Sequence, residues 1–265
     1  MGVQDFQSDI DFVEFARQLK QKTGVDLLSY KQGQVLRRLT SLRERKGFHS
    51  FAAFYRAMER DKELYDAFID QLTINVTEFY RNPGRWEVLR RQILPEILRS
   101  GLSRIKCWSA ACSTGDEPYS IVLTVSDFLP LQNIEVHATD IDSAVIDKAK
   151  IGKYAASAVR EVPQDKLSKY FSMDNDGYRI AEAIKGRVRF RQHDLLTDPY
   201  ESGYDLIVCR NVVIYFTDEA KTRIYHKFSK SLKPGGYLFV GGVEQISNPA
   251  DYGLESTAMF FYKKL

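Results

Sequence analysis

The sequence IKCWSAACSTGDEP, at residues 105–118, joins a short apolar run to a helical segment through small residues and one glycine. The apolar run predicts a buried strand, and the continuation EPYSIVLTVSDFL, at residues 117–129, predicts a helix. Small residues at such a junction let the backbone approach a ligand closely. Because ligands of open α/β sheets bind at the carboxyl ends of strands, this junction is the first candidate site.

Strands and helices alternate through the rest of the chain. Strands are expected at residues 134–140, 187–196, 204–211 and 233–244, with helices at residues 142–154 and 218–233. DNDG, at residues 174–177, predicts a turn, and the aromatic run MFFYKK, at residues 259–264, predicts a final edge strand. This alternation predicts an α/β fold with a mostly parallel, doubly wound sheet.

The first part of the chain is predicted to be helical. Apolar residues recur at helical spacing from Ile10 to Leu19, and further helices are expected at residues 31–46, 50–60 and 62–72. A connecting helix near residues 86–98 leads to the first strand. We therefore expect a helical domain at residues 1–80, a linker helix at residues 81–104 and an α/β domain at residues 105–265.

Charge and composition argue against several classes of protein. The 265 residues include 38 Lys and Arg against 35 Asp and Glu, and this net charge of +3 argues against a nucleic-acid-binding polycation. No apolar run is long enough to span a bilayer and the acidic start is not typical of a secretory signal, so we expect no direct membrane insertion. Three cysteines without a CxxC pair favour a reduced, cytoplasmic protein without bound metal.

Acidic residues follow two of the predicted strands. Asp116 and Glu117, at the start of a helix, would repel a pyrophosphate and favour a ligand that carries positive charge, although both acids could simply cap the helix. Asp140 follows the next strand, where an acid commonly binds ribose hydroxyls. Asp142 or Ser143 is expected to cap the helix that comes after it.

Two further strand ends carry polar residues. HDLL, at residues 193–196, could read an adenine edge. Arg210 and Asn211 close an apolar strand, where polar groups are costly unless they bind a ligand or form structural hydrogen bonds. The GxGxxG fingerprint of dinucleotide enzymes is absent from the first junction. These features together favour S-adenosylmethionine, which carries ribose, adenine and positive charge but no phosphate.

Six segments of the sequence resemble one protein family. They are TINVTEFYRNPGRW (73–86), WSAACSTGDEPYS (108–120), ATDID (138–142), CRNVVIYF (209–216), LKPGGYLF (232–239) and GGVEQ (241–245). In these segments and in their order, the chain resembles the chemotaxis receptor methyltransferases, the CheR family, and most of all its Bacillus-type members. The resemblance implies a small all-α domain, then a Rossmann-like S-adenosylmethionine-dependent methyltransferase domain with a small antiparallel β-subdomain near residues 170–191.

The resemblance also implies functional residues. Cofactor-binding residues would be Asn75, Thr77, Arg81, Glu117, Asp140, Asp194, Leu195, Arg210 and Asn211. Glu117 would face the methionyl portion, and Asp140 would bind the ribose. Asp194 stands where the family often has Asn, so the contact on the adenine side could differ. Arg81 and Tyr215 would be catalytic, Arg81 by orienting the substrate carboxylate and Tyr215 by holding the reacting groups in line.

The implied reaction moves a methyl group from S-adenosylmethionine to glutamate side chains in the cytoplasmic helical domain of chemotaxis receptors, and leaves S-adenosylhomocysteine. Residues 31–46 carry six basic residues against Glu44 alone, a surface that would attract an acidic receptor segment. We expect docking through Arg37, Arg38, Arg43, Arg45 and Lys46, although a charge run is also typical of a solvated helix. A monomer is expected. The alternative function is a non-catalytic, S-adenosylmethionine-binding regulator of a signalling system.

Overall fold

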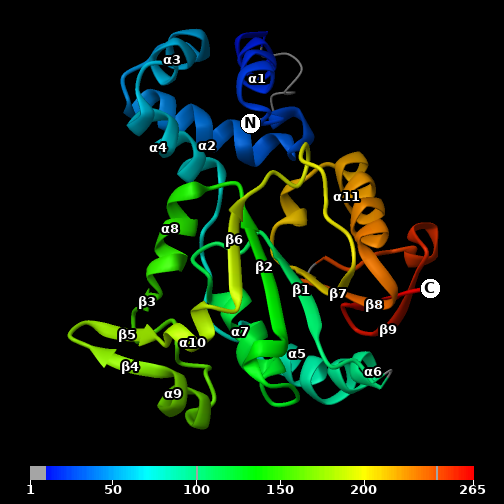
Figure 1. Cartoon of the computed structure of the whole chain (residues 1–265). Coiled ribbons are helices and arrows are strands. Elements are labelled where there is room, and N and C mark those ends of the chain that lie inside the picture. The colour runs from blue at the N-terminus through cyan, green and yellow to red at the C-terminus, as the bar shows by residue number, and fades with distance from the viewer. Residues whose placement is uncertain (1–9, 100, 243) are drawn as a thin grey trace. The chain divides into compact units, whose positions relative to one another are not determined.

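The computed structural model describes residues 10–99, 101–242 and 244–265 of the chain (Figure 1). These residues form two compact units. The first unit contains the residues up to 74 together with residues 194–199 and 214–224, and the second contains residues 75–193, 200–213 and 225–265. None of the described helices has the length and apolar character needed to cross a membrane.

The helices of the first unit confirm the helices predicted within residues 10–72, whereas residues 1–9 of the predicted helical domain lie outside the described residues. They are α1 (Ile10–Thr23), α2 (Gln32–Arg45), α3 (Phe51–Met58) and α4 (Lys62–Leu72). The side chain of Ser50 caps α3 by accepting a hydrogen bond from the N–H of Ala53 at 3.1 Å. The ring of Phe15 lies within 6.3 Å, centroid to centroid, of five other aromatic rings, so α1, α3 and α4 share an aromatic core.

A seven-stranded sheet forms the centre of the second unit, in the order β6-β2-β1-β7-β8-β10-β9. Its strands are β1 (Ile105–Ala110), β2 (Ile134–Asp140), β6 (Val188–Gln192), β7 (Tyr204–Cys209), β8 (Leu232–Val240), β9 (Leu254–Ala258) and β10 (Phe261–Lys264). The five strands from β6 to β8 are parallel. Strand order reverses between β1 and β7, and the predicted mostly parallel, doubly wound sheet is confirmed.

The predicted final edge strand is not at the edge. β10 lies between β8 and β9 and runs antiparallel to both. Phe260, whose φ is 71°, turns the chain so that β9 pairs outside β10. Three of the five residues of β9 are exposed, and their polar side chains suit an edge strand. The prediction was wrong because β9, LESTA, lacks the apolar alternation that marks a half-buried strand.

A small three-stranded antiparallel sheet is also present, in the order β3-β5-β4. It contains β3 (Lys153–Tyr154), β4 (Phe171–Asp174) and β5 (Gly177–Ile180), and in Figure 1 the hairpin of β4 and β5 projects away from the large sheet. The predicted turn at residues 174–177 joins β4 to β5. The expected range 170–191 therefore contains this hairpin, whereas β3 lies before that range and β6 belongs to the large sheet.

Helices of the second unit cover the sheet and complete its core. They are α5 (Pro83–Val88), α6 (Leu94–Leu98), α7 (Asp116–Val125), α8 (Ser143–Ile151), α9 (Gln164–Tyr170), α10 (Glu182–Lys185) and α11 (Asp218–Ser231), whose first half belongs to the first unit. Short 3-10 turns occur at Leu27–Ser29, Leu131–Asn133, Val213–Tyr215 and Pro249–Tyr252. A π-helical turn at Leu89–Ile93 joins α5 to α6, where Pro95 lacks the N–H that a regular helix needs.

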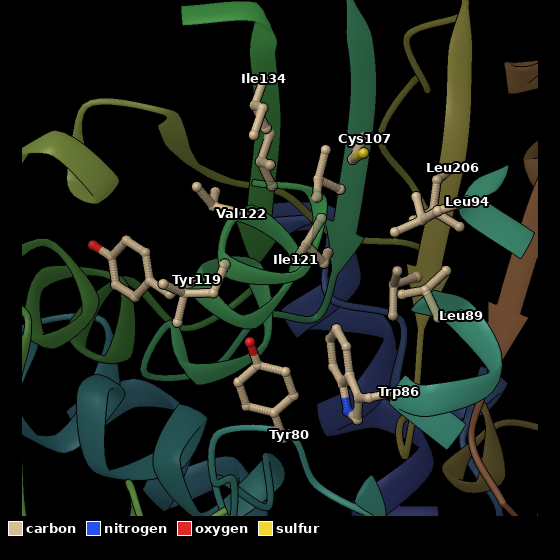
Figure 2. Close-up of a cluster of buried hydrophobic side chains, with 14 of the residues drawn as sticks. Tyr80, Trp86, Leu89, Leu94, Cys107, Tyr119, Ile121, Val122, Ile134 and Leu206 are labelled. Carbon is tan, nitrogen blue, oxygen red and sulfur yellow. The ribbon is translucent and has the colours of Figure 1, made fainter. Parts of the chain in front are cut away.

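The linker helix packs as part of the second unit. Figure 2 shows Trp86, Leu89 and Leu94 beside side chains of α7 and of the strands, including Ile121 and Leu206. All five of these residues are at most 3% exposed. The core therefore fixes both the segment before α5 and the start of α7, and these two regions carry the polar residues described next.

Candidate active site

The turn between β1 and α7 is held in an unusual backbone conformation. Ala111, Ser113 and Gly115 have φ values of 68°, 46° and 92°. A Cβ atom at Gly115 would lie 2.8 Å from the Cβ of Ala149, so this position requires glycine on two grounds. Left-handed residues other than glycine at a strand end are typical of functional loops, because the surrounding structure must hold them there.

Asp140, at the end of β2, accepts hydrogen bonds from this turn. Its carboxylate accepts the N–H of Ser113 at 2.8 Å and the N–H of Asp142 at 3.1 Å. Burial raises the pKa of Asp140 to about 6, while the two backbone donors oppose that rise. Asp140 thus lies at the carboxyl end of the parallel strands, where the sequence predicted a ribose ligand.

Contacts between residues far apart in the sequence hold Asn75 at the same carboxyl end of the strands. Its amide nitrogen donates to Asp142 at 3.1 Å, and the hydroxyl of Ser113 donates to its amide oxygen at 3.4 Å. Asp142 also accepts from the N–H of Ala144 at 2.9 Å, so the prediction that Asp142 or Ser143 caps α8 is confirmed for Asp142. Asn75 therefore links the segment before α5 to the ends of β1 and β2.

Glu117 is the accessible member of the acidic pair at the start of α7. Asp116 is 1% exposed and accepts a hydrogen bond from the hydroxyl of Thr114 at 2.6 Å. The side chain of Glu117 is 12% exposed, and its carboxylate accepts the hydroxyl of Ser109 at 2.8 Å. Burial raises the pKa of Glu117 to about 7, and the nearby Arg210 lowers it in part. A buried carboxyl of this kind favours a ligand with positive charge.

Arg210 is a deeply buried cation beside Glu117. Its side chain is 3% exposed, and its Nη1 lies 3.7 Å from Glu117. Its Nη2 donates to the carbonyl of Arg81 at 2.7 Å and to the side chain of Asn82 at 2.9 Å. The guanidinium also lies 4.9 Å from the ring centre of Phe239. Of the two roles expected for Arg210, ligand binding or structural hydrogen bonds, these contacts match the second, because they fix the segment around Arg81.

Arg81 lies between two residues with left-handed backbone. Tyr80 and Asn82 have φ values of 53° and 61°. The carbonyl of Arg81 accepts from Arg210 and from the indole N–H of Trp86 at 3.1 Å, and its Nη1 donates to the carbonyl of Val76 at 2.7 Å. The backbone of Arg81 is therefore tightly held, while its half-buried side chain keeps further N–H donors for a ligand. Thr77 is half-buried in the same segment.

Glu244 organises the ends of β7 and β8, a role that the sequence analysis missed. Its carboxylate accepts the N–H groups of Asn211 at 2.7 Å, Val212 at 2.9 Å and Gly241 at 2.8 Å. Asn211 has a φ of 61°. A Cβ atom at Gly241 would lie 2.8 Å from the nitrogen of Asn211, so only glycine lets the two strand ends approach this closely. The acid in GGVEQ, directly after an apolar strand, was the available signal.

Three predicted site residues belong to the first unit. Asp194 forms a local turn, because its side chain accepts the N–H of Leu196 at 2.8 Å and its N–H donates to Asp198 at 2.9 Å. Leu195 is buried. The carbonyl of Tyr215 accepts the N–H of Lys31 at 2.7 Å, and the guanidinium of Arg38 lies 5.9 Å from the centre of its ring. The backbone of Tyr215 is thus anchored to the start of α2.

The basic residues of α2 and Lys46, which directly follows this helix, differ in what they offer to a partner. Arg37, Arg45 and Lys46 are exposed, and Arg45 donates to the side chain of Gln71 at 2.8 Å. The side chain of Arg43 is only 15% exposed, and its guanidinium lies 4.7 Å from the ring centre of Phe51. Arg43 therefore has a packing role, and its charge is not presented to a partner as expected. Arg38 is directed to Tyr215.

The residues of the second unit fit S-adenosylmethionine. Glu117 offers a carboxylate to a cationic group, Asp140 offers oxygen acceptors to ribose hydroxyls, and neither strand end presents the glycine-rich phosphate cradle of a dinucleotide site. In the described ranges, no group of three or more His, Cys, Asp or Glu is arranged to hold a metal ion. The fold and these acids define a methyltransferase of the S-adenosylmethionine-dependent class.

Comparisons with known proteins identify the family within that class. Residues 75–260 match the family model for the CheR methyltransferase, SAM binding domain, and residues 10–73 match the CheR methyltransferase, all-alpha domain. The chain belongs to the CheR methyltransferase family, which confirms the resemblance carried by its motifs. S-adenosylmethionine is its cofactor.

Curated relatives match over nearly the whole chain. A chemotaxis protein methyltransferase of Listeria monocytogenes is 43% identical over 96% of this chain and 97% of its own length. Chemotaxis protein methyltransferase 1 of Pseudomonas aeruginosa is 35% identical over 92% of this chain and 93% of its own length. Chemotaxis protein methyltransferase 2 of Vibrio cholerae is 36% identical over 91% of this chain and 87% of its own length. These alignments are long enough to include residues of both matched family domains of this chain.

Proposed function

We propose that this protein methylates glutamate side chains in the cytoplasmic helical domain of chemotaxis receptors, as part of sensory adaptation. It would act in the cytoplasm as a monomer. The near full-length match to chemotaxis methyltransferases carries the proposal. The test is transfer of labelled methyl to a purified receptor fragment and to the same fragment with its candidate glutamates changed to aspartate. Equal labelling of both would overturn the assignment to glutamate.

The site chemistry supports a carboxylate as the methyl acceptor. When bound, S-adenosylmethionine supplies an electrophilic methyl group on a sulfonium. A glutamate with a pKa of about 4.3 is already ionised at neutral pH, so its oxygen needs no general base. Arg81 would hold this carboxylate by charge-assisted hydrogen bonds, and its clamped backbone limits how far the guanidinium can move. Tyr215 would hold the reacting groups in line.

The cofactor is assigned to the polar residues of the strand ends. Glu117 would face the positively charged methionyl portion, and Asp140 would accept the ribose hydroxyls. Asn75, Thr77 and Arg81 would bind it from the segment before α5, with Asp194 and Leu195 on the adenine side. Arg210 and Asn211 would support the site from the end of β7, since Arg210 already fixes Arg81 and Asn211 is fixed by Glu244.

Cofactor affinity should depend on pH through Glu117. Burial raises its pKa to about 7, and the α-ammonium group that S-adenosylmethionine and S-adenosylhomocysteine share prefers the ionised carboxylate, so binding releases a proton below that pH. We expect S-adenosylhomocysteine, titrated by calorimetry, to bind roughly tenfold more weakly at pH 6 than at pH 8. Glu117→Gln should bind more weakly at both pH values and show a flatter profile. An affinity of the unaltered protein that does not change with pH would contradict this role.

Receptor docking should depend on the exposed basic residues of α2. Reversing two of them, as Arg45→Glu with Lys46→Glu, should lower methylation of a receptor fragment by about tenfold at low salt, because an acidic partner is then repelled. Lys62→Glu is a control for charge reversal away from α2, since Lys62 is 87% exposed on α4. Arg38 is left intact in this test because of its contact with Tyr215. Equal loss in control and test variants, or loss of S-adenosylhomocysteine binding, would argue against docking through α2.

A further inference from the structure

A polar cavity of about 410 Å³ lies at the opposite end of the parallel strands from the methyl-transfer site. Arg104 and Asn133, which directly precede β1 and β2, line it together with Arg187, which directly precedes β6. The charged residues of its wall are five basic and two acidic ones: Arg104, Lys106, Arg187, Arg189, Lys233, Glu135 and Asp205. Nothing in the proposed methyl transfer uses this cavity.

Both acidic residues of the cavity are already paired. Asp205 accepts from Lys233 at 2.7 Å and from the backbone N–H of Lys106 at 2.8 Å. Glu135 forms an ion pair with Arg189 at 3.1 Å and contacts His137 at 2.9 Å. These carboxylates therefore have their charge neutralised within the wall of the cavity, and they cannot balance its remaining cations.

Two arginines of the cavity keep unused donors. Arg104 is exposed and Arg187 is half-buried, and the structure gives neither side chain a hydrogen bond or ion pair with any other residue it describes. The Nε of Arg187 is in addition buried without an acceptor. A buried N–H that lacks an acceptor is costly, and most such groups in folded proteins are satisfied by a partner, a water or an ion. An oxyanion in the cavity would supply the missing acceptor.

The sheet places these two arginines on either side of β2. Ile105 pairs with Ile134, and Val188 pairs with Val136, so Arg104 and Arg187 flank the amino end of the same strand. Neighbouring strands are about 4.8 Å apart, which separates the two backbones by about 10 Å. Two long side chains starting at that separation can converge on one group. The planar guanidinium fork matches the oxygens of a phosphate group better than a lysine does.

The size and polarity of the cavity restrict the ligand further. A volume of about 410 Å³ falls within the range of about 300–1,000 Å³ that holds small molecules. Gln132 and Asn133 add amide donors and acceptors, whereas Ile105 and Ile134 are its apolar wall residues. Such a wall suits a hydrophilic, anionic molecule and disfavours a lipid tail.

We propose that this cavity binds the phosphate group of a small phosphorylated molecule, with Arg104 and Arg187 as its principal ligands. The site is separate from the methyl-transfer site, and it does not depend on the identity of the methyl acceptor. Because the interaction is electrostatic, the affinity should fall as the salt concentration rises.

Calorimetry on the full chain saturated with S-adenosylhomocysteine tests this proposal. The probes are inorganic phosphate, pyrophosphate and adenosine diphosphate at low salt. We expect saturable binding of at least one probe, and the double variant Arg104→Gln with Arg187→Gln should weaken it by at least about tenfold. Arg160→Gln, which removes one positive charge at an exposed position of the second unit, should leave it unchanged. Unaltered S-adenosylhomocysteine affinity in each variant shows that the fold is kept.

The outcomes separate a nucleotide from a ligand that is recognised by its phosphate groups alone. Tighter binding of adenosine diphosphate than of pyrophosphate would indicate a nucleotide, and equal binding would indicate that the phosphate groups alone are recognised. Either result supports the site if the double variant loses it. The proposal is overturned if no probe binds saturably to the saturated protein, or if the double variant binds as well as the Arg160→Gln control.

Discussion

Arg81→Ala is expected to lower the rate of methyl transfer to a receptor fragment by at least about a hundredfold, with a much smaller change in S-adenosylhomocysteine affinity. Loss of the guanidinium leaves the substrate carboxylate without an orienting partner, and a misplacement of about 1 Å can cost 10²-fold in rate. The carbonyl of Arg81, which Arg210 and Trp86 hold, is unaffected by removal of the side chain. The fold should therefore persist.

Two further variants test whether the effect depends on the guanidinium group of Arg81 and not only on a positive charge in this segment. Arg81→Lys keeps the charge but loses the planar fork, so its rate should fall between those of the unaltered protein and Arg81→Ala. Arg85→Ala removes a neighbouring cation whose guanidinium lies over the ring of Phe260 at 4.7 Å, and its rate should stay near normal. Initial rates with saturating S-adenosylmethionine provide the measurement. Full turnover in Arg81→Ala would remove Arg81 from the catalytic assignment.

Glu244→Ala is expected to destabilise the second unit by about 3–5 kcal/mol. The substitution removes a buried carboxylate that accepts three backbone N–H groups, and each donor left buried without an acceptor costs about 1–3 kcal/mol. Because Asn211 and Gly241 would lose their common acceptor, the ends of β7 and β8 should also separate. Urea unfolding followed by far-ultraviolet circular dichroism measures the effect.

A second Glu→Ala substitution, at an exposed position, controls for the loss of a glutamate side chain that makes no buried hydrogen bonds. Glu255→Ala removes an exposed glutamate from the edge strand β9, and a surface change of this kind should stay within about 0.5 kcal/mol. The account of Glu244 would be wrong if both variants unfolded at the same urea concentration as the unaltered protein. Equal destabilisation by both variants would also contradict it.

Much of the fold could be predicted because its elements have strong local patterns. The helices of the first unit are amphipathic and are started by Ser50 and Asp61, whose side chains accept the N–H groups of Ala53 and Leu64. Short apolar runs mark the strands β1, β2 and β7, and Asp140 and Arg210 lie at the end of β2 and directly after β7. Since ligands bind where such strands end, Asp140 and Glu117 could be selected from the sequence. The weakly patterned β9 could not be found in the same way.

The remaining features depend on contacts between residues far apart in the sequence. Glu244 meets Asn211, and Asn75 meets Asp142, only after the sheet has formed. The same holds for Arg43, whose packing on Phe51 could not be read from the basic run that contains it. Local periodicity carries no information about such pairs, so a charge pattern alone cannot separate a packed arginine from an exposed one.

The chemical nature of the methylated product tests the central claim most directly. A purified receptor cytoplasmic fragment is incubated with the protein and S-adenosylmethionine labelled in its methyl group, and the labelled fragment is then treated with mild base. We predict that base releases the label as volatile methanol, because a glutamyl methyl ester hydrolyses readily. Label that stays on the fragment after this treatment would show methylation of a nitrogen or another group, and would contradict methyl transfer to a carboxylate.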